Sequence, residues 1–470
     1  MKKLGETKFV GKIAGWFERF MKKYFDSQTM SYHTVLSIYI PLLIDQAFVS
    51  MMTVVNSSMV SSSGAEAVSA VSMVDSLNFF LTNLFIAIAT GGTVVVAQYI
   101  GKGDKRKASR TISQAVTSSV LIAVIVAAVI IIFSKQTLGL LFGKADQLIL
   151  DNALIYLIGS AISYPFYAVY QASAGALRGL GDTKASMMMS VAMNVIYLLG
   201  NIVFIEFMGL GVLGVSISMV ISRICVSIFA LIYLIFKRAD LKVQAKDFFT
   251  LDMGLQKSIL YIGIPAGTEQ LFFNGGKILV QTFVVMLGTM SITANAIGMN
   301  VMSMWQIPAN AIQLASITIA GQCVGAGRPD EARKYLRSLN RTARLVCLIM
   351  ILILWPLTPW ILGFFNPPDE ARTKIMFLMI FPVVGLLTTW APSFITPSIL
   401  RAAGDAKFTT VAALISVWTV RVGLGYVLAI ICGLDIYGVW LAMILEWGSR
   451  AAIFTWRFKG NKWEQHKFIN

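Results

Sequence analysis

The chain has 470 residues, of which 57% are hydrophobic and 13% charged, and its mean hydropathy is +0.73. A water-soluble globular domain usually carries about 25% charged residues, so this composition excludes one and indicates a membrane protein. The formal net charge is +16, and its meaning depends on where the basic residues lie along the chain.

The N-terminal segment, residues 1–35, interleaves lysines and arginines with aromatic and aliphatic residues at helical spacing. It lacks the long apolar stretch of a signal peptide. The pattern predicts a basic amphipathic helix on the membrane surface, with a frayed cytoplasmic tail as the alternative.

Twelve apolar stretches follow, each long enough to cross a bilayer, which takes about 20 residues in a helix. They are apolar all round rather than alternating, which favours helices over the strands of a β-barrel. The stretches lie near 36–61, 71–98, 111–133, 152–174, 186–206, 213–236, 258–286, 293–322, 343–363, 376–398, 409–430 and 437–457. We therefore expect an all-α integral membrane protein with twelve transmembrane helices.

The basic residues predict the orientation of these helices. Of the 39 lysines and arginines, 31 fall on the side of the N-terminal segment, four on the opposite side and four within spans. Basic loops stay in the cytoplasm, so we expect both termini there, in a multi-pass protein of the cell (inner or plasma) membrane. Membrane lipid then explains the net charge, and neither nucleic acid nor an obligate protein partner is expected.

The second half of the chain repeats the first. Residues 38–110 align with 262–334 at an offset of 224 without a gap, and the offset becomes 223 in the loops at 177–184 and 400–407. The matches include Pro41 with Pro265, Asp45 with Glu269, Gln46 with Gln270, Gln98 with Gln322, Gly101 with Gly325 and Arg178 with Arg401.

Each repeat contains six spans, an even number, so both halves enter the membrane from the same side as parallel repeats. This predicts two six-helix bundles, an N-lobe at 36–237 and a C-lobe at 258–457, joined by a cytoplasmic linker at 238–257. A cytoplasmic tail follows at 458–470. Two such lobes enclose a cavity near the midplane that rocking can open to either side, as in alternating-access transport.

Three segments and their second-half counterparts resemble the MATE (multidrug and toxic compound extrusion) family over about residues 36–457: IPLLIDQAFVSMMTVVNSSMVSSSGAEAVSA, GGTVVVAQYIGKGDKRKA and ALRGLGDTK. The resemblance implies an antiporter rather than an enzyme, without a cofactor, that couples H⁺ or Na⁺ entry to export of amphipathic, often cationic, small molecules. Many relatives carry an acidic residue where this chain has Asn56. Asp45 shares a helical face with Asn56, about 16 Å away along the axis, and is a candidate replacement.

The energy source is expected to be an ion gradient. Gly276-Lys277 continues into Ile278, and no GxxxxGK[ST] phosphate loop occurs. Both histidines, His33 and His466, lie outside the predicted spans, so carboxylates would have to carry protons.

Asp45, Glu269 and Asp75 are the candidate ion-coupling residues, because a carboxylate inside a membrane is costly and marks a functional site by default. The alternative for Asp45 and Glu269 is a structural ion pair with Lys277 or Arg421. Asp75 lies near the outer boundary, where a charge costs less, so a structural role is favoured for it.

Polar residues inside spans are candidates for the cavity wall, although such groups often only join neighbouring helices. Asn194, Tyr197 and Asn201 form one polar stripe at i, i+3 and i+7. The complete set is Asn56, Gln46, Gln270, Asn194, Tyr197, Asn201 and Lys277. The cytoplasmic pairs Arg178/Asp182 and Arg401/Asp405 are candidate latches, or simply turn residues.

Competing functions are a flippase for a lipid-linked oligosaccharide or other lipid-like substrate, a membrane enzyme and a channel. No GxSxG or HExxH motif supports an enzyme, and the four isolated cysteines suggest no metal site. A strongly cationic cavity would favour the flippase. The four intramembrane cations are matched by four acids, with Glu446 and Arg450 neutralising one another on the last helix, so no surplus positive cavity is expected.

Overall fold

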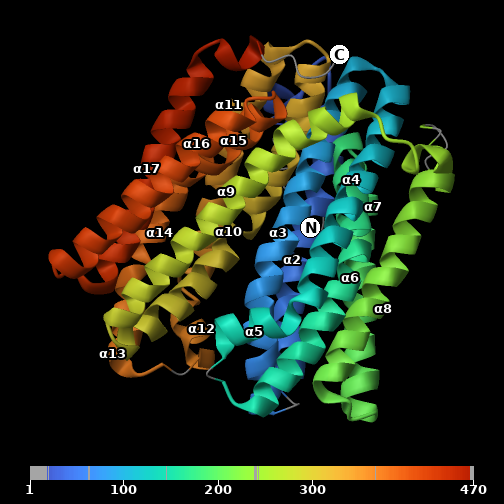
Figure 1. The fold of residues 1–470 in the computed structure, drawn as a ribbon. Coiled ribbons are helices and arrows are strands. Elements are labelled where there is room, and N and C mark those ends of the chain that lie inside the picture. Colours follow the sequence, from blue (N-terminus) through green and yellow to red (C-terminus); the bar gives the residue numbers. More distant parts are fainter. Residues whose placement is uncertain are drawn as a thin grey trace, which may run out of the picture.

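The computed structural model describes residues 18–19, 21–61, 64–143, 145–237, 241, 243–365 and 367–465. Within these ranges the chain is helical apart from short connections, and no strand occurs. Figure 1 shows two bundles of long helices that touch at one end and diverge toward the other. The predicted all-helical fold class is confirmed.

The N-lobe contains six long helical rods, some extended by short or π-helical segments. They are α2 (Tyr32–Ser61), α3 (Ala65–Lys102), α4 (Lys105–Ile132) with α5 (Ser134–Phe142), α6 (Gln147–Leu180), α7 (Thr183–Asn201) with a π-helix (Ile202–Phe207), and α8 (Gly211–Ile232) with a π-helix (Tyr233–Lys237).

The C-lobe repeats this order after a short 3₁₀ turn (Ala245–Phe248). Its elements are α9 (Met253–Met286), α10 (Thr289–Gly325), α11 (Pro329–Leu354) with α12 (Thr358–Phe365), α13 (Asp369–Leu378), α14 (Ile380–Gly385), a π-helix (Leu386–Trp390), α15 (Ala391–Ala402), α16 (Ala406–Ser416), π-helices Val417–Leu424 and Val427–Ile431, α17 (Asp435–Lys459) and a 3₁₀ turn (Lys462–Gln465).

Nine helical stretches among the described residues are long and apolar enough to cross a membrane. The remaining predicted spans exist as α9, α11 and α17, which carry more charged and polar residues. In α17 these residues include Glu446 and Arg450, both buried inside the lobe. A helix whose charges face the protein interior can still present an apolar face to lipid, so its average hydropathy understates its fit to the membrane.

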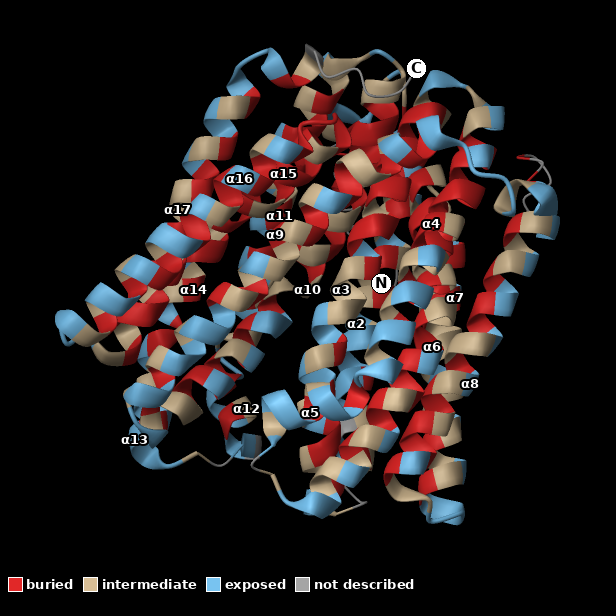
Figure 2. Ribbon diagram, viewed as in Figure 1, coloured by how far each residue is buried: buried red, intermediate tan, exposed pale blue. Residues whose placement is uncertain are grey.

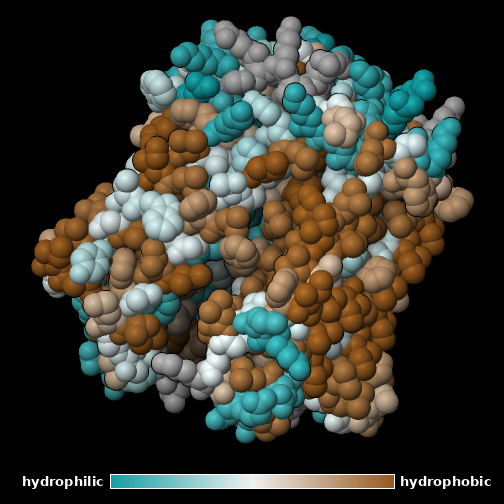
Figure 3. Space-filling view, viewed as in Figure 1, coloured by the Kyte–Doolittle hydropathy of each residue, from teal (hydrophilic) through white to brown (hydrophobic). Residues whose placement is uncertain are grey.

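The surface supports this membrane assignment. Figure 3 shows hydrophilic residues gathered at one end of the molecule and a broad hydrophobic belt over the N-lobe below it. Large aliphatic side chains such as Ile125, Ile132 and Ile278 are more than half exposed, whereas buried residues follow the interior faces of the helices (Figure 2). A water-soluble protein rarely exposes so large an apolar area, and lipid would cover it here.

The predicted amphipathic N-terminal helix falls largely on residues 1–17, outside the described part of the chain. Residues 21–25 are helical, and Met21 and Phe25 are buried in the same hydrophobic cluster as Tyr335 of α11. The Tyr335 hydroxyl lies 3.1 Å from the Phe25 carbonyl oxygen. The end of this segment is therefore anchored on the C-lobe.

The lobes meet at the end of the molecule that carries the basic turns at 102–107 and 328–334 and the linker, called the basic face below. There the C-terminal half of α3 packs against α9 and α10. A Cβ atom at Gly101 would overlap the Gln322 carbonyl oxygen, and one at Gly325 would overlap the Gln98 carbonyl oxygen. Glycine is required at both positions because two backbones approach closely.

Hydrogen bonds across this contact follow the sequence repeat. Gln98 Nε2 of the N-lobe donates to the Ala402 carbonyl oxygen at 2.6 Å, and Gln322 Nε2 of the C-lobe donates to the Gly179 carbonyl oxygen at 3.0 Å. Residues 179 and 402 are related by the same offset of 223 that relates the two loops. These two bonds are thus reciprocal, with each lobe supplying the same donor and the same acceptor.

We expect Gly101→Val or Gly325→Val to push the lobes apart at the basic face, since overpacking costs about 1–3 kcal/mol. The measurement is the distance between spin labels at Lys184→Cys and Lys407→Cys, two exposed repeat-related positions, in a background without native cysteines. Gly139→Val is the control, because a Cβ there meets nothing within 4 Å. An unchanged distance distribution in both interface variants would contradict the close-contact explanation.

Candidate functional site

Each lobe contains a cavity on the side away from the basic face contacts, and Figure 3 shows a hollow between the lobes. The N-lobe cavity has a volume of about 380 Å³. Its wall is mainly polar and aromatic and is drawn from five helices. It includes Asn56 of α2, Ser72 and Asp75 of α3, Tyr156 and Tyr167 of α6, Met193, Asn194 and Tyr197 of α7, and Met219 and Arg223 of α8.

The N-lobe cavity holds one acid and one base, each anchored separately. Asp75 accepts hydrogen bonds from the Tyr156 hydroxyl at 2.9 Å and from Asn78 Nδ2 at 3.4 Å. Arg223 donates to Ser163 Oγ at 2.6 Å, and its guanidinium carbon lies 4.5 Å from the Tyr167 ring centre. This cavity therefore carries no surplus of either charge among its lining residues.

Three predicted residues of this lobe do not line that cavity. Asn201 is fully buried within the lobe, and Gln46 is absent from the wall. Asp45 is also buried, with 8% of its surface exposed, and lies near Ser190 and Arg178. Asp75, expected near the outer boundary, lies well inside α3, because that helix begins at Ala65, earlier than its hydropathy indicated.

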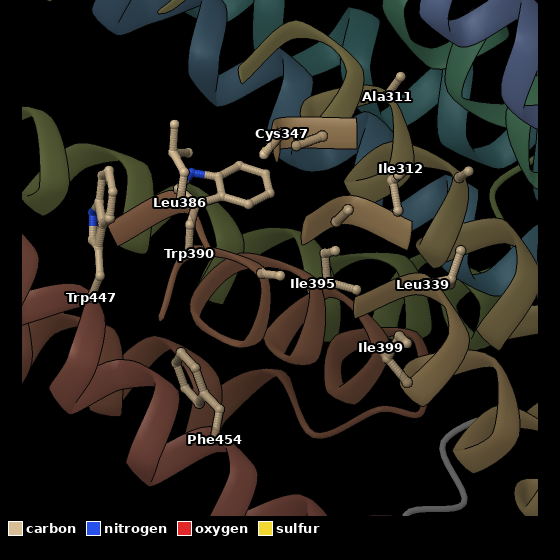
Figure 4. Close-up of a cluster of buried hydrophobic side chains, with 14 of the residues drawn as sticks. Ala311, Ile312, Leu339, Cys347, Leu386, Trp390, Ile395, Ile399, Trp447 and Phe454 are labelled. Atoms are coloured by element: carbon tan, nitrogen blue, oxygen red, sulfur yellow. The ribbon is translucent and has the colours of Figure 1, made fainter. Parts of the chain in front are cut away.

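The C-lobe cavity has a volume of about 280 Å³ and a different wall. Aromatic side chains form one side of it: Trp390 stacks on Phe394 with ring centres 5.0 Å apart, and Trp447 meets Phe394 edge-on at 6.0 Å. Figure 4 shows Trp390 and Trp447 projecting from different helices in this region. Gln270 and Lys277, both predicted for the cavity, are among its lining residues.

Charged groups fill the inner part of the C-lobe cavity. Glu269 pairs with Arg401 at 3.2 Å and with Arg450 at 3.7 Å. Glu446, with none of its surface exposed, pairs with Arg450 at 3.3 Å and lies 4.0 Å from Arg421. Arg450 therefore bridges the two acids instead of serving Glu446 alone, which corrects the simpler pairing expected along α17.

The expectation of no surplus positive cavity is wrong for the C-lobe. Lys277, Arg401, Arg421 and Arg450 line this cavity, whereas among the described residues the only carboxylates beside them are Glu269 and the buried Glu446. The four cations and four acids counted over all the predicted spans are unevenly divided, since Asp45 and Asp75 belong to the other lobe. Arg401, expected in a cytoplasmic turn, lies in the last turn of α15 and reaches into the lobe.

Lys277 was expected to meet a carboxylate from another helix. Its ammonium group instead lies 4.7 Å from the Phe273 ring centre, and no acid lies within ion-pair distance of it in the described part of the chain. The guanidinium carbon of Arg421 lies 5.3 Å from the same ring. Two cations thus share one aromatic side chain, a contact that each makes with the negative π face.

Two wall residues that were not among the predicted cavity residues lie in π-helical segments. Arg421 belongs to the π-helix Val417–Leu424, and Trp390 ends the π-helix Leu386–Trp390. Such wide turns are frequent at functional sites, but they shift the helical register without leaving a mark in the residue pattern. The sequence offers one indication of this part of the wall: Trp390 and Phe394 are four residues apart, a spacing that places both side chains on one helical face.

Each of the four candidate latch side chains contacts another side chain of its own lobe. Asp182 accepts from the Tyr233 hydroxyl at 3.0 Å, and Arg178 donates to Ser186 Oγ at 3.2 Å. Asp405 pairs with Arg457 at 2.7 Å, while Arg401 pairs with Glu269. The lobes are joined across the basic face by Gln98 and Gln322 and by the Thr318 hydroxyl, which donates to the Arg178 carbonyl oxygen at 2.8 Å. Gln256 Nε2 of α9 also donates to Gln114 Oε1 of α4 at 2.9 Å.

Comparison with known proteins agrees with this architecture. The model of the MatE family matches residues 41–203 and again 265–427, which confirms the duplication. An uncharacterized transporter, YisQ, of Bacillus subtilis is 26% identical over 92% of this chain and 95% of its own length. A probable multidrug resistance protein, NorM, of Thermotoga maritima is 26% identical over 86% of this chain and 87% of its length. A solved multidrug resistance MATE transporter in an outward-facing conformation shares the fold, with a TM-score of 0.82 and 18% identity over 91% of this chain and 96% of that one.

We expect Glu446→Gln to destabilise the protein by about 3 kcal/mol or more, because it leaves Arg450 and Arg421 buried and poorly neutralised. Thermal unfolding in a neutral detergent would measure this as a lowered Tm. Glu370→Gln is the matched control: its side chain is 65% exposed and lies 3.6 Å from Lys374, so its effect should be small. Equal Tm changes in the two variants would contradict a structural role for Glu446.

Proposed function

The chain belongs to the MatE family of multidrug efflux transporters, which are not enzymes, and we propose that it exports amphipathic small molecules in exchange for H⁺ or Na⁺. The observation that carries the proposal is the pair of charged cavities, one in each lobe, in a molecule closed at one face and hollowed toward the other. Such an arrangement suits alternating access.

We place the basic face in the cytoplasm, because loops rich in lysine and arginine stay on that side. The present conformation is then outward-open. The contacts of Gln98 and Gln322 close the cytoplasmic side, together with those of Thr318 and Gln256. Breaking all of these contacts would let the lobes rock open to the inside.

Asp45 and Glu269 are the proposed coupling residues, and their surroundings support different roles. Glu269 is held by two arginines. Asp45, its counterpart in the repeat, has one buried carboxylate oxygen that lacks a hydrogen-bond partner, and Arg178 is the cation whose charge acts on it. A buried charge with so little compensation is costly, so Asp45 is the better place for a neutralising H⁺ or Na⁺.

Substrate would contact the walls of the two cavities. The tyrosines and methionines of the N-lobe cavity offer broad, adaptable apolar contacts, and Asp75 can attract a cationic group. Asn56, Asn194 and Tyr197 add hydrogen-bonding groups at the same wall. These features fit compounds of varied shape that combine an aromatic body with a polar or charged group.

A flippase for a lipid-linked oligosaccharide or other lipid-like substrate is the second candidate. The surplus positive charge of the C-lobe cavity favours it, because such substrates carry phosphate groups that arginine and lysine bind well. A flippase moves a lipid across the membrane and is not expected to export a soluble dye, whereas the exporter is.

The test is transport of rhodamine 6G, a lipophilic cation, measured as efflux from energised whole cells or as uptake into inverted vesicles under separate H⁺ and Na⁺ gradients. If one net charge crosses the membrane in each cycle, a membrane potential of 100 mV sustains a ratio of about fifty between the dye concentrations on the two sides. We expect this ratio to fall toward one in Asp45→Asn, with Glu269→Gln also impaired, while Asp146→Asn at the exposed start of α6 retains it. The gradient that supports efflux names the coupling ion.

Full efflux in both carboxylate variants would limit Asp45 and Glu269 to structural roles. If correctly folded protein in the membrane gave no efflux under the H⁺ gradient and none under the Na⁺ gradient, the exporter would be rejected and the flippase favoured.

A further inference from the structure

We propose that the C-lobe cavity is a binding site for an amphipathic organic anion, with its carboxylate, sulfonate or phosphate head between Lys277 and Arg421. This refines the substrate class and rests on the proposed transport function. It differs from the often cationic substrates that the family resemblance implies.

The positive charge at this position is not compensated by the described part of the protein. Glu269 and Glu446 together face Arg401, Arg450 and Arg421, and the contact of Arg421 with Glu446 is the longest of these at 4.0 Å. Lys277 has no acid at ion-pair distance among the described residues. The network as a whole carries four cations and two acids, so the charge needed for neutrality is that of an anion.

Lys277 and Arg421 come from different elements and converge on one ring. They lie 4.7 Å and 5.3 Å from the centre of Phe273, on α9 and on a π-helix respectively. Cation–π contacts recover only about 0.5–2 kcal/mol each, much less than the cost of holding two like charges together inside a membrane. Lys277 is nevertheless exposed to the hollow, where a ligand can reach it.

An apolar chamber of about 380 Å³ adjoins this cationic pair. It shares Lys277, Arg421, Met299 and Met443 with the C-lobe cavity. The remaining wall is chiefly aliphatic and aromatic and consists of Ile278, Val280, Gln281, Asn295, Ala296, Val439 and Trp440.

The polar groups of this chamber already bond to one another. Trp440 Nε1 donates to Asn295 Oδ1 at 3.0 Å, and Asn295 Nδ2 donates to Gln281 Oε1 at 3.2 Å. The wall therefore offers a ligand mainly apolar contact. A molecule with an anionic head and an apolar body would place the head on Lys277 and Arg421 and the body in this chamber.

The unpartnered donors of the C-lobe cavity point to the same ligand chemistry. Among the described residues, Gln306 Nε2 and Trp447 Nε1 are buried in its wall without an acceptor. Buried donors without partners are costly, and an anionic head with several oxygen atoms supplies acceptors that a cationic ligand lacks. The N-lobe cavity, with one acid and one base among its lining residues, shows no such imbalance.

The experiment compares two xanthene dyes of similar size and opposite charge, fluorescein at pH 8 and rhodamine 6G, binding to the purified full-length protein in dodecyl maltoside. Fluorescence anisotropy above the micelle background reports binding. We expect fluorescein to bind and Lys277→Met to weaken it about tenfold, as for loss of one charge-assisted hydrogen bond. Lys277→Arg should retain most of the affinity, and rhodamine 6G binding should not weaken in Lys277→Met.

Lys135→Met is the matched control, since Lys135 is exposed on α5 of the other lobe, and it should bind both dyes like the parent protein. Arg421→Met is a second variant, with Tm measured alongside because Arg421 also contacts Glu446. Titration with dioleoylphosphatidylglycerol distinguishes the source of the anion. Displacement of fluorescein would indicate that the site binds an anionic lipid, and no displacement would indicate a dissolved organic anion.

Failure of fluorescein to bind, or equal affinity of the parent protein and Lys277→Met for it, would overturn the anion site. If rhodamine 6G efflux still followed an ion gradient in that case, the proposed exporter would stand without the site. Lys277-dependent fluorescein binding in a protein that exports neither dye under any gradient would preserve the site and reject the exporter.

Discussion

The need to neutralise charge inside the membrane governs the structure of the C-lobe. Glu446 is completely buried and is tolerable there only because Arg450 and Arg421 lie beside it. Arg450 in turn contacts Glu269, which ties α17 to α9, and Arg401 adds α15 to the same group. Removing one member of such a network leaves the others unpaired, so its parts are interdependent.

The duplication gives both lobes one topology but not one chemistry. Asp45 near Arg178 and Glu269 near Arg401 occupy corresponding positions, yet only the second pair lies within ion-pair distance. The C-lobe adds Lys277, Arg421 and Arg450 around it, whereas the N-lobe cavity has tyrosines and a single balanced acid and base. A shared scaffold thus carries two cavities of different chemistry.

The interface between the lobes combines close backbone contact with uncharged hydrogen bonds. Glycines at 101 and 325 let backbones touch, and the bonds from Gln98 and Gln322 end on carbonyl groups at the lobe surface. Neither glutamine belongs to the ion network of the C-lobe. Separation of the lobes would expose a few amide groups to water at the membrane boundary, a small cost compared with breaking a buried ion pair.

The sequence by itself determined the membrane class, the all-helical fold and the repeat, because these depend on composition and on patterns that extend over tens of residues. Of the candidate coupling and cavity residues that it identified, the structure places seven in cavity walls: Asp75, Asn56, Asn194, Tyr197, Glu269, Gln270 and Lys277. That they bind an ion or substrate remains a prediction.

Only the tertiary structure decided which charges meet. Arg450 was paired with Glu446 from their spacing on one helix, but its contact with Glu269 depends on how α17 packs against α9. The positive surplus of the C-lobe could not be read from a count of charges over all the spans, because electrostatic compensation acts over a few ångströms and helix packing divides the charges between lobes. The π-helical turns that carry Arg421 and Trp390 alter the register locally, and one-dimensional periodicity does not reveal them.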